Sequence, residues 1–143
     1  MFVLIFLSGN VFSQVEDITF KVTNYEINGV NYDNQAIDGD LALSFYKCDD
    51  ETLCFSNFFR AYDTQSYGGV FSLKKQSYKE TSKEHAYDEF QFTWDYVNTY
   101  DSDRGKAKVT LTKIYIGKSV KMIAEIIVLN TNDVLKFKGY LEE

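Results

Sequence analysis

Apolar and polar residues alternate with a period of two along much of this chain. In DEFQFTWDY, residues 88–96, a ring occupies every second position, at Phe90, Phe92, Trp94 and Tyr96. Alternate side chains of an extended strand point to opposite faces, so these rings share one side. No long segment has the period of 3.6 residues typical of a helix. The pattern predicts strands.

Short turns join this row of rings to the strands that follow. Gly117 in IGKS suits the first central position of a two-residue type II′ turn. Further turns are predicted at YDSDRG, residues 100–105, and at Thr131-Asn132 within NTND. Each of these turns sets a strand register that keeps the apolar residues of neighbouring strands on one face, as a half-buried sheet requires. The predicted opposite pairs are Tyr115 with Val120, Leu111 with Ala124, Val128 with Leu135, Ile126 with Phe137, Ala124 with Gly139, Trp94 with Leu111 and Tyr96 with Val109.

The first half of the chain is less regular but also predicts strands. Asn28-Gly29 is a strong hairpin signal. Residues 31–40 are interpreted as a loop, and the polar residues 79–88 as a connection that could hold a helical turn. About eight strands joined in sequence predict an all-β, single-domain antiparallel meander. Closing it into an up-and-down barrel removes its exposed edges, and a two-sheet β-sandwich is the alternative.

Composition supports one folded domain over residues 14–143. The chain has 143 residues, of which 45% are hydrophobic and 17% aromatic, and it contains no proline. Its net charge is −6 and its pI is about 4.8. Nucleic-acid binding needs a basic patch to contact phosphates, and the sequence shows none. Binding to anionic membrane surfaces is disfavoured for the same reason.

Residues 1–13 are interpreted as an export signal. An apolar run from Phe2 to Leu7 is followed by Val11 and Ser13 in small-residue positions ahead of a cleavage point. No Lys or Arg precedes the run, so the signal is N-terminally incomplete; a buried first strand is the alternative. The run is too short to be a transmembrane helix, which needs roughly 20 apolar residues. The predicted location is the periplasm, the outer surface or the outside of the cell.

Cys48 and Cys54 flank a short polar stretch in FYKCDDETLCF. If Asp50 to Thr52 form a three-residue hairpin loop, the two cysteines lie opposite each other, at a separation that a disulfide can span. Disulfides persist in exported proteins, so this pair and the signal support one another. Two free thiols or half of a metal site are the alternatives, but a zinc site needs more ligands than one histidine can add.

Few residues form a catalytic pattern. His85 is the single histidine and lies in a charged stretch, and no nucleophile motif accompanies it. Asp101, Asp103 and Gly105 resemble part of a calcium loop, but Thr112 stands where its glutamate is needed, so hairpin-turn chemistry is favoured. The sequence predicts a protein that is not an enzyme and that carries no cofactor and no metal.

In length, export, antiparallel meander and aromatic interior the chain resembles the lipocalin-like (calycin) group, and in general character small exported proteins of Gram-negative bacteria. The first-strand region, VEDITFKVTNYEI, carries no Gly-x-Trp motif, so the first resemblance is one of architecture. It implies a barrel that holds a small hydrophobic ligand. A surface or periplasmic protein-interaction or structural module, with a fully packed core and no ligand, is the alternative. The candidate barrel-lining residues are Phe90, Phe92, Trp94, Tyr96, Leu111, Met122 and Phe137.

Overall fold

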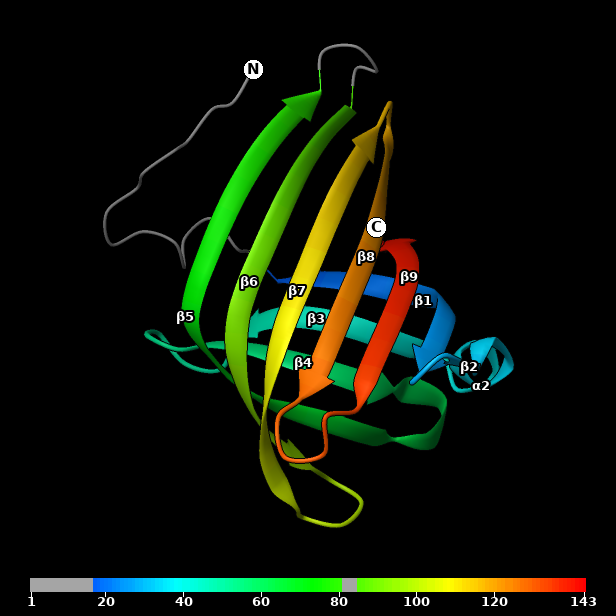
Figure 1. Cartoon of the computed structure of the whole chain (residues 1–143), viewed down its shortest axis with the longest axis vertical. Coiled ribbons are helices and arrows are strands. Elements are labelled where there is room, and N and C mark those ends of the chain that lie inside the picture. The colour runs from blue at the N-terminus through cyan, green and yellow to red at the C-terminus, as the bar shows by residue number, and fades with distance from the viewer. Residues whose placement is uncertain (1–16, 81–84) are drawn as a thin grey trace.

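The computed structural model describes residues 17–80 and 85–143 and shows a closed antiparallel β-barrel (Figure 1). Eight strands follow one another around the barrel, and β1 pairs with β9 to close it, while the short β2 adds to the edge of β1. The predicted barrel is therefore confirmed, and the alternative of a two-sheet sandwich is wrong. The strands are β1 (Ile18–Ile27), β2 (Val30–Asn31), β3 (Leu41–Lys47), β4 (Leu53–Phe59), β5 (Thr64–Glu80), β6 (His85–Asn98), β7 (Arg104–Ile116), β8 (Ser119–Val128) and β9 (Val134–Leu141).

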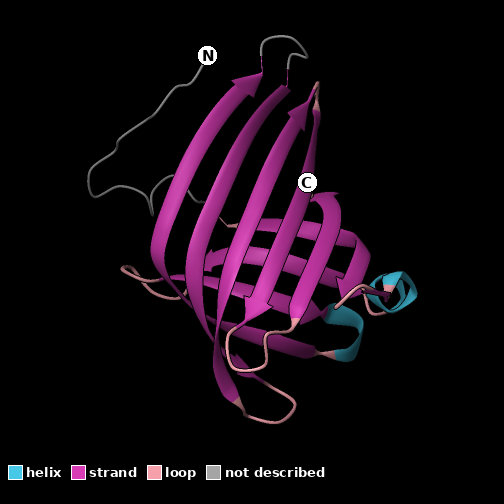
Figure 2. Ribbon diagram, in the orientation of Figure 1, coloured by secondary structure: helices cyan, strands magenta, loops and turns pink. Residues whose placement is uncertain are grey.

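The barrel has two walls that cross at a steep angle. Figures 1 and 2 show β5 to β8 as long, curved front strands with the shorter β9 beside them, and β1, β3 and β4 running across behind. β5, β6, β7 and β8 project beyond the back strands at the upper end of the view. The loops 99–103 and 129–133 lie at the lower end. The two ends of the barrel are therefore differently built.

Aromatic side chains from both walls fill the space between them. Phe45 on β3 and Phe55 on β4 are 1% and 0% exposed, and their ring centroids are 5.1 Å apart. Phe92 from β6 lies edge-on to both, at 5.4 and 5.3 Å. Centroid separations of this size are typical of favourable edge-to-face ring pairs. The centre of the barrel is packed core.

Of the three registers predicted for the hairpins of the second half, the one at the Gly117 turn is correct. In β7–β8, Gly117 has φ +60°, and Leu111 lies opposite Ala124, as predicted. In β8–β9 the predicted register is wrong by two residues, because Leu135 pairs with Ile126. The two-residue turn is replaced by a longer loop, in which Asn132 has φ +60° and donates its N–H to the carbonyl of Val128.

The β6–β7 register is wrong by four residues. Trp94 lies opposite Ala107 instead of Leu111, and Phe92 pairs with Val109, which was predicted to pair with Tyr96. The turn lies earlier than YDSDRG suggests, because Ser102 takes the positive φ of +62° and its N–H bonds to the carbonyl of Asn98. An even shift leaves the same residues facing inward, so the apolar face survives the error.

Two other expectations for the irregular segments are corrected. Residues 31–40 contain the helix α2 (Asp33–Asp38), which packs on β1: Ala36 is 0% exposed, and the carboxylate of Asp33 accepts the N–H of Tyr25 at 2.8 Å. The predicted connection 79–88 is strand wherever it is described, at the end of β5 and the start of β6. The Asn28-Gly29 hairpin is confirmed, with Ile27 opposite Val30.

Residues 1–13, the predicted export signal, lie outside the described residues. In the described ranges, 17–80 and 85–143, neither α2 nor the short 3₁₀ helix η1 (Arg60–Tyr62) has the length and apolar character needed to cross a membrane.

Cys48 and Cys54 form the predicted disulfide, with their Cα atoms 5.7 Å apart. The predicted three-residue loop is wrong, however, since Tyr46 lies opposite Cys54 and Cys48 belongs to the turn. The carboxylate of Asp49 accepts the backbone N–H groups of Glu51 and Thr52, both at 2.8 Å. The disulfide closes the five-residue connection between β3 and β4. It therefore holds the β3–β4 hairpin of the back wall together.

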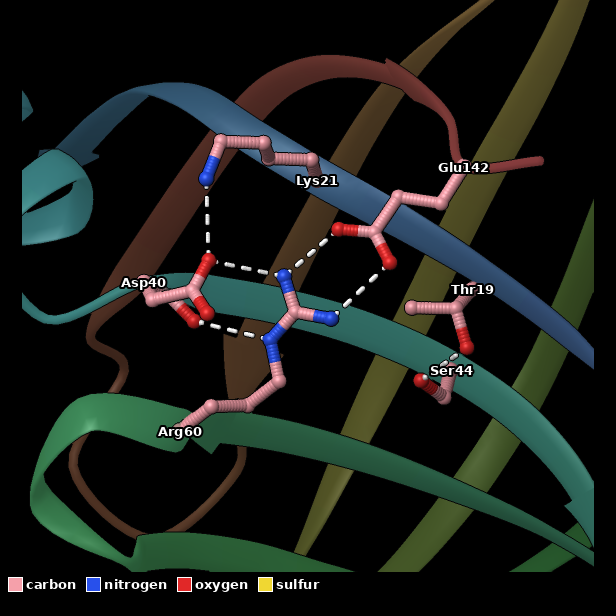
Figure 3. Close-up of polar contacts among 6 residues, drawn as sticks. All are labelled: Thr19, Lys21, Asp40, Ser44, Arg60 and Glu142. Carbon is pink, nitrogen blue, oxygen red and sulfur yellow. Dashed lines mark hydrogen bonds and ion pairs between the residues drawn. The ribbon is translucent and has the colours of Figure 1, made fainter.

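A network of charges fastens the C-terminal end to the back wall (Figure 3). The Arg60 guanidinium donates to both carboxylate oxygens of Glu142, at 2.6 and 2.9 Å, and to Oδ1 of Asp40 at 2.8 Å. Lys21 on β1 donates to the same Asp40 oxygen at 2.9 Å. Hydrogen bonds from Lys21 and Arg60 hold the pKa of Asp40 below its usual range, and Arg60 does the same for Glu142. The network connects β1 with the segments that adjoin β3, β4 and β9.

Replacing Arg60 by methionine is expected to lower the free energy of unfolding by about 1 to 2 kcal/mol at neutral pH. A bidentate, partly buried arginine pair stabilises more than an isolated surface pair does. Asp40 and Glu142 have lower pKa values in the folded than in the unfolded state. Their contribution to the free energy of unfolding is therefore fully present above the unfolded pKa values of about 4, and it is lost as the pH falls through the folded values. Urea titrations of both proteins at several pH values test this. Lys108→Met, which removes an exposed cation from β7, is the control. An equal loss in both variants, or a loss that is no smaller in strong acid than at neutral pH, contradicts the prediction.

Gly139 is expected to tolerate no side chain. A Cβ at Gly139 would overlap the Lys21 carbonyl oxygen, where β1 and β9 close the barrel. Gly139→Ala should therefore cost about 3 kcal/mol or more, or prevent folding, because backbone must shift. Gly117→Ala is the matched comparison, since a Cβ there meets open space and only the positive φ is strained, at about 1 to 2 kcal/mol. Thermal unfolding of the two variants measures the difference, and equal stabilities would refute the close approach.

Candidate ligand-binding hollow at the barrel mouth

The lower end of the barrel is hollowed, with a volume of about 550 Å³. We call this space the mouth hollow. Residues from β1, β4, β5, β6, β7, β8 and β9 surround it, together with the loops 99–103 and 129–133. Its lining consists of Tyr25, Ile27, Asn57, Ser66, Trp94, Tyr96, Asn98, Tyr100, Asp103, Arg104, Ile126, Val128, Asn130, Thr131, Asp133 and Leu135.

Buried apolar and aromatic side chains form the floor of the mouth hollow. Trp94 is 3% exposed, and its indole N–H donates to the carbonyl of Phe55 at 3.0 Å. Its ring lies 5.1 Å from that of Tyr96, one step nearer the opening. On the other side Tyr25 stacks on Phe137, with centroids 4.9 Å apart and planes within 9°. These contacts fix the rings before any ligand arrives.

Polar side chains line one wall of the hollow in a single row. Asn57 lies opposite Ser66 across β4 and β5, and Ser66 lies opposite Asn98 across β5 and β6. The hydroxyl of Ser66 donates to Oδ1 of Asn98 at 2.5 Å. Oδ1 of Asn57 is buried and has no hydrogen-bond partner among the described residues. An unpartnered buried acceptor is costly, so this wall favours a group that donates hydrogen bonds.

Carboxylates surround the opening. Asp103 and Asp133 line the hollow, and Asp101 belongs to the same loop as Asp103. Burial raises the pKa of the Tyr96 phenol, and the charges of Asp101, Asp103 and Asp133 raise it further. Burial, with smaller effects of neighbouring Tyr100 and Tyr32, also raises the pKa of Tyr25. Both phenols are therefore neutral and able to donate at physiological pH.

The structure divides the seven residues predicted to line a ligand cavity into two groups. Trp94 and Tyr96 line the mouth hollow. The others are 0% to 4% exposed. Phe90 and Phe92 contact Phe45 from the back wall, at centroid distances of 5.7 and 5.4 Å. Those packed below the hollow are Phe90, Phe92, Leu111, Met122 and Phe137.

Most lining residues of the mouth hollow were not predicted. Tyr25, Asn57 and Ser66 come from the irregular first half, where only the Asn28-Gly29 turn and the Cys48–Cys54 hairpin were predicted. Asn57 carries a signal that could have found it. It is a polar residue two positions from Phe55 and from Phe59, and so lies at an inward position of an otherwise apolar row.

The inner face of the upper end carries polar side chains that satisfy one another. The carboxylate of Asp88 accepts hydrogen bonds from Ser77 at 2.6 Å and from Tyr115 at 2.7 Å. Lys113 lies over the Tyr115 ring, 5.2 Å from its centroid, and burial lowers the pKa of Lys113. Because these groups are paired with each other, this end is a weaker candidate for a site than the mouth hollow.

Catalytic and metal-binding alternatives gain no geometric support. Asp101 accepts the N–H of Asp103 at 2.9 Å, which is the hairpin-turn role favoured by the sequence. His85 starts β6, but its side chain lies outside the described part of the chain. In residues 17–80 and 85–143 no group of three or more His, Cys, Asp or Glu side chains is arranged to hold a metal ion.

The fold and the hollow together define a class, a closed eight-stranded antiparallel barrel with a hollow at one end. Comparisons with protein-family models, curated proteins and solved structures found no match.

Trp94 is the one tryptophan of the chain, so its fluorescence reports on the floor of the hollow. We expect a blue-shifted native emission, because the indole is buried, and a red shift on unfolding. Trp94→Phe should lower the free energy of unfolding by about 1 to 3 kcal/mol, since it leaves the Phe55 carbonyl without its donor. Native and unfolded spectra of the unmodified chain, with denaturant titrations of both proteins, test this. A native emission matching that of the unfolded chain would show that Trp94 is exposed.

Proposed function

We propose that this protein is an exported, non-catalytic binding protein that holds a small, largely hydrophobic ligand in the mouth hollow of a lipocalin-like barrel. The observation that carries the proposal is a hollow of about 550 Å³ with a rigid aromatic floor and a polar wall. Ligand sites in proteins are typically about 300 to 1,000 Å³ and combine apolar walls with a few polar groups. The mouth hollow has both the size and the mixture.

The ligand is placed at the mouth because the centre of the barrel is full. Phe45, Phe55 and Phe92 are in mutual ring contact there, so a deep ligand would have to displace several buried rings. Trp94 and Tyr96 are the predicted site residues that a ligand at the mouth would touch. The role of Phe90, Leu111, Met122 and Phe137 would then be to support the floor.

Export remains part of the proposal. The Cys48–Cys54 disulfide supports it, since such bonds persist in oxidising compartments. The predicted signal at residues 1–13 agrees with this, and the periplasm, the outer surface and the extracellular medium all meet the condition.

A packed interior also favours a second function, that of a protein-interaction or structural module with no ligand. Several large side chains of the described residues are exposed and could contact a partner. Tyr62, Tyr67, Phe71 and Tyr100 are 60%, 39%, 50% and 65% exposed. Tyrosine is enriched at protein interfaces, so these side chains suit such a role.

Blocking the hollow separates the two functions. Nile red, a neutral apolar dye, is expected to bind the full chain and to quench Trp94 by energy transfer. Ser66→Phe places a ring in the hollow and should weaken binding by at least about tenfold, which corresponds to 1.4 kcal/mol. Gln65→Phe adds the same ring at the neighbouring outward position of β5 and should change the affinity by less than about twofold.

Circular dichroism of both variants should show a folded β-protein. Nile red that binds Ser66→Phe as tightly as the unmodified chain, or fails to bind the unmodified chain, would reject the mouth hollow as a ligand site.

Native mass spectrometry of protein from its own host gives an independent result. A co-purifying small apolar molecule supports ligand binding, whereas a stable oligomer without ligand supports the interaction module.

A further inference from the structure

Charges and ring faces around the mouth hollow restrict the kind of ligand that fits. We propose that the hollow selects ligands in which an ammonium group is attached to a small apolar body. This inference rests on the ligand-binding function proposed above and names the chemical class of its ligand.

Carboxylates come to the opening from two different loops. Asp103 ends the β6–β7 loop, and Asp133 ends the β8–β9 loop. Asp133 is held in place, because it accepts hydrogen bonds from the Asn28 amide at 2.9 Å and from the Thr131 hydroxyl at 2.8 Å. The charges of both carboxylates, with that of Asp101, act on the half-buried phenol of Tyr96. Their negative potential therefore reaches into the hollow, where it is less screened than at the surface.

Arg104 is the one cationic side chain among the described residues that line the hollow. Its position on β7 faces outward, since Ala107 and Val109, at odd separations from it, are buried inside the barrel. Arg104 also borders a groove on the outer surface, together with Tyr67 and Lys106. The arginine therefore lies at the edge of the opening, and the lining, with Asp103, Asp133 and Arg104, keeps a net negative charge.

Aromatic rings in the lining of the hollow suit a cation. Tyr25, Trp94, Tyr96 and Tyr100 all belong to the lining. A cation near the faces of tryptophan and tyrosine rings is attracted by their electron density, more strongly when it is partly removed from water. An ammonium group at the opening would meet these rings on one side and the carboxylates on the other.

The hydrogen-bonding groups of the wall favour the same ligand. The unpartnered Asn57 oxygen is an acceptor, and an ammonium group has three donors and no acceptor. A carboxylate ligand would instead bring a second negative charge to the negatively charged opening. Positive and negative ligands with the same apolar body should therefore differ in affinity in a defined direction.

Phenethylamine, phenethyl alcohol and hydrocinnamate share a phenylethyl group and carry an ammonium, a hydroxyl and a carboxylate group, respectively. Titration calorimetry with the full chain at neutral pH should show the amine binding about tenfold more tightly than the alcohol, and hydrocinnamate binding most weakly. Added salt should weaken the binding of the amine and leave that of the alcohol nearly unchanged, because screening acts on charges.

Asp103→Asn removes one carboxylate from the lining and should lower the affinity for phenethylamine by about threefold or more, with little effect on the alcohol. Asp38→Asn, an exposed change on α2 outside the hollow, is the matched control and should alter neither affinity. The inference is overturned if the alcohol or hydrocinnamate binds as tightly as the amine, while the ligand-binding function then stands. If none of the three compounds binds, the inference fails. If Nile red does not bind either, the proposed function fails with it.

Discussion

The contact of aromatic rings across the barrel determines most of what this structure can do. Phe45 and Phe55 from the back wall reach the rings of β6 on the front wall, at 5.2 to 5.7 Å between centroids. Two crossed walls leave a space that only large side chains fill, and dense packing there excludes a ligand. The contact ends at Trp94, whose indole N–H donates a hydrogen bond to the Phe55 carbonyl. The hollow lies beyond this contact, where Trp94 and Tyr96 belong to its lining.

The fold class could be predicted from sequence because its signal has a period of two. Apolar faces, strand order and the Asn28-Gly29 and Gly117 turns follow from residues next to one another in the chain. Exact pairing of strands does not, since a slip by two or four residues keeps every apolar residue on the inner face. The slips occurred where Ser102 and Asn132 adopt positive φ values, a conformation that non-glycine residues take rarely and that sequence signals weakly.

The site was harder to predict, because the alternation of apolar and polar residues does not show how far along the barrel axis a residue lies. Phe90, Phe92, Trp94 and Tyr96 share one face of β6, yet the first two are core and the last two border a hollow. Phe90 and Phe92 pack on Phe45 of β3, a contact between strands far apart in sequence that the alternation along β6 does not signal. A row of rings predicts which face of the strand points inward. It does not predict at which residue the packed core ends.

The loops that frame the mouth are held by contacts within the protein. Asn28 donates to the carboxylate of Asp133 and accepts the N–H of Val134 at 2.8 Å, which ties the β8–β9 loop to the first hairpin. Thr99 bonds with the backbone of Gln65 through both its N–H and its hydroxyl, which ties the β6–β7 loop to β5. A ligand entering such a frame would order little of the chain, and binding loses less entropy when the site is already formed. The same hydrogen bonds that complete the barrel therefore prepare its open end for binding.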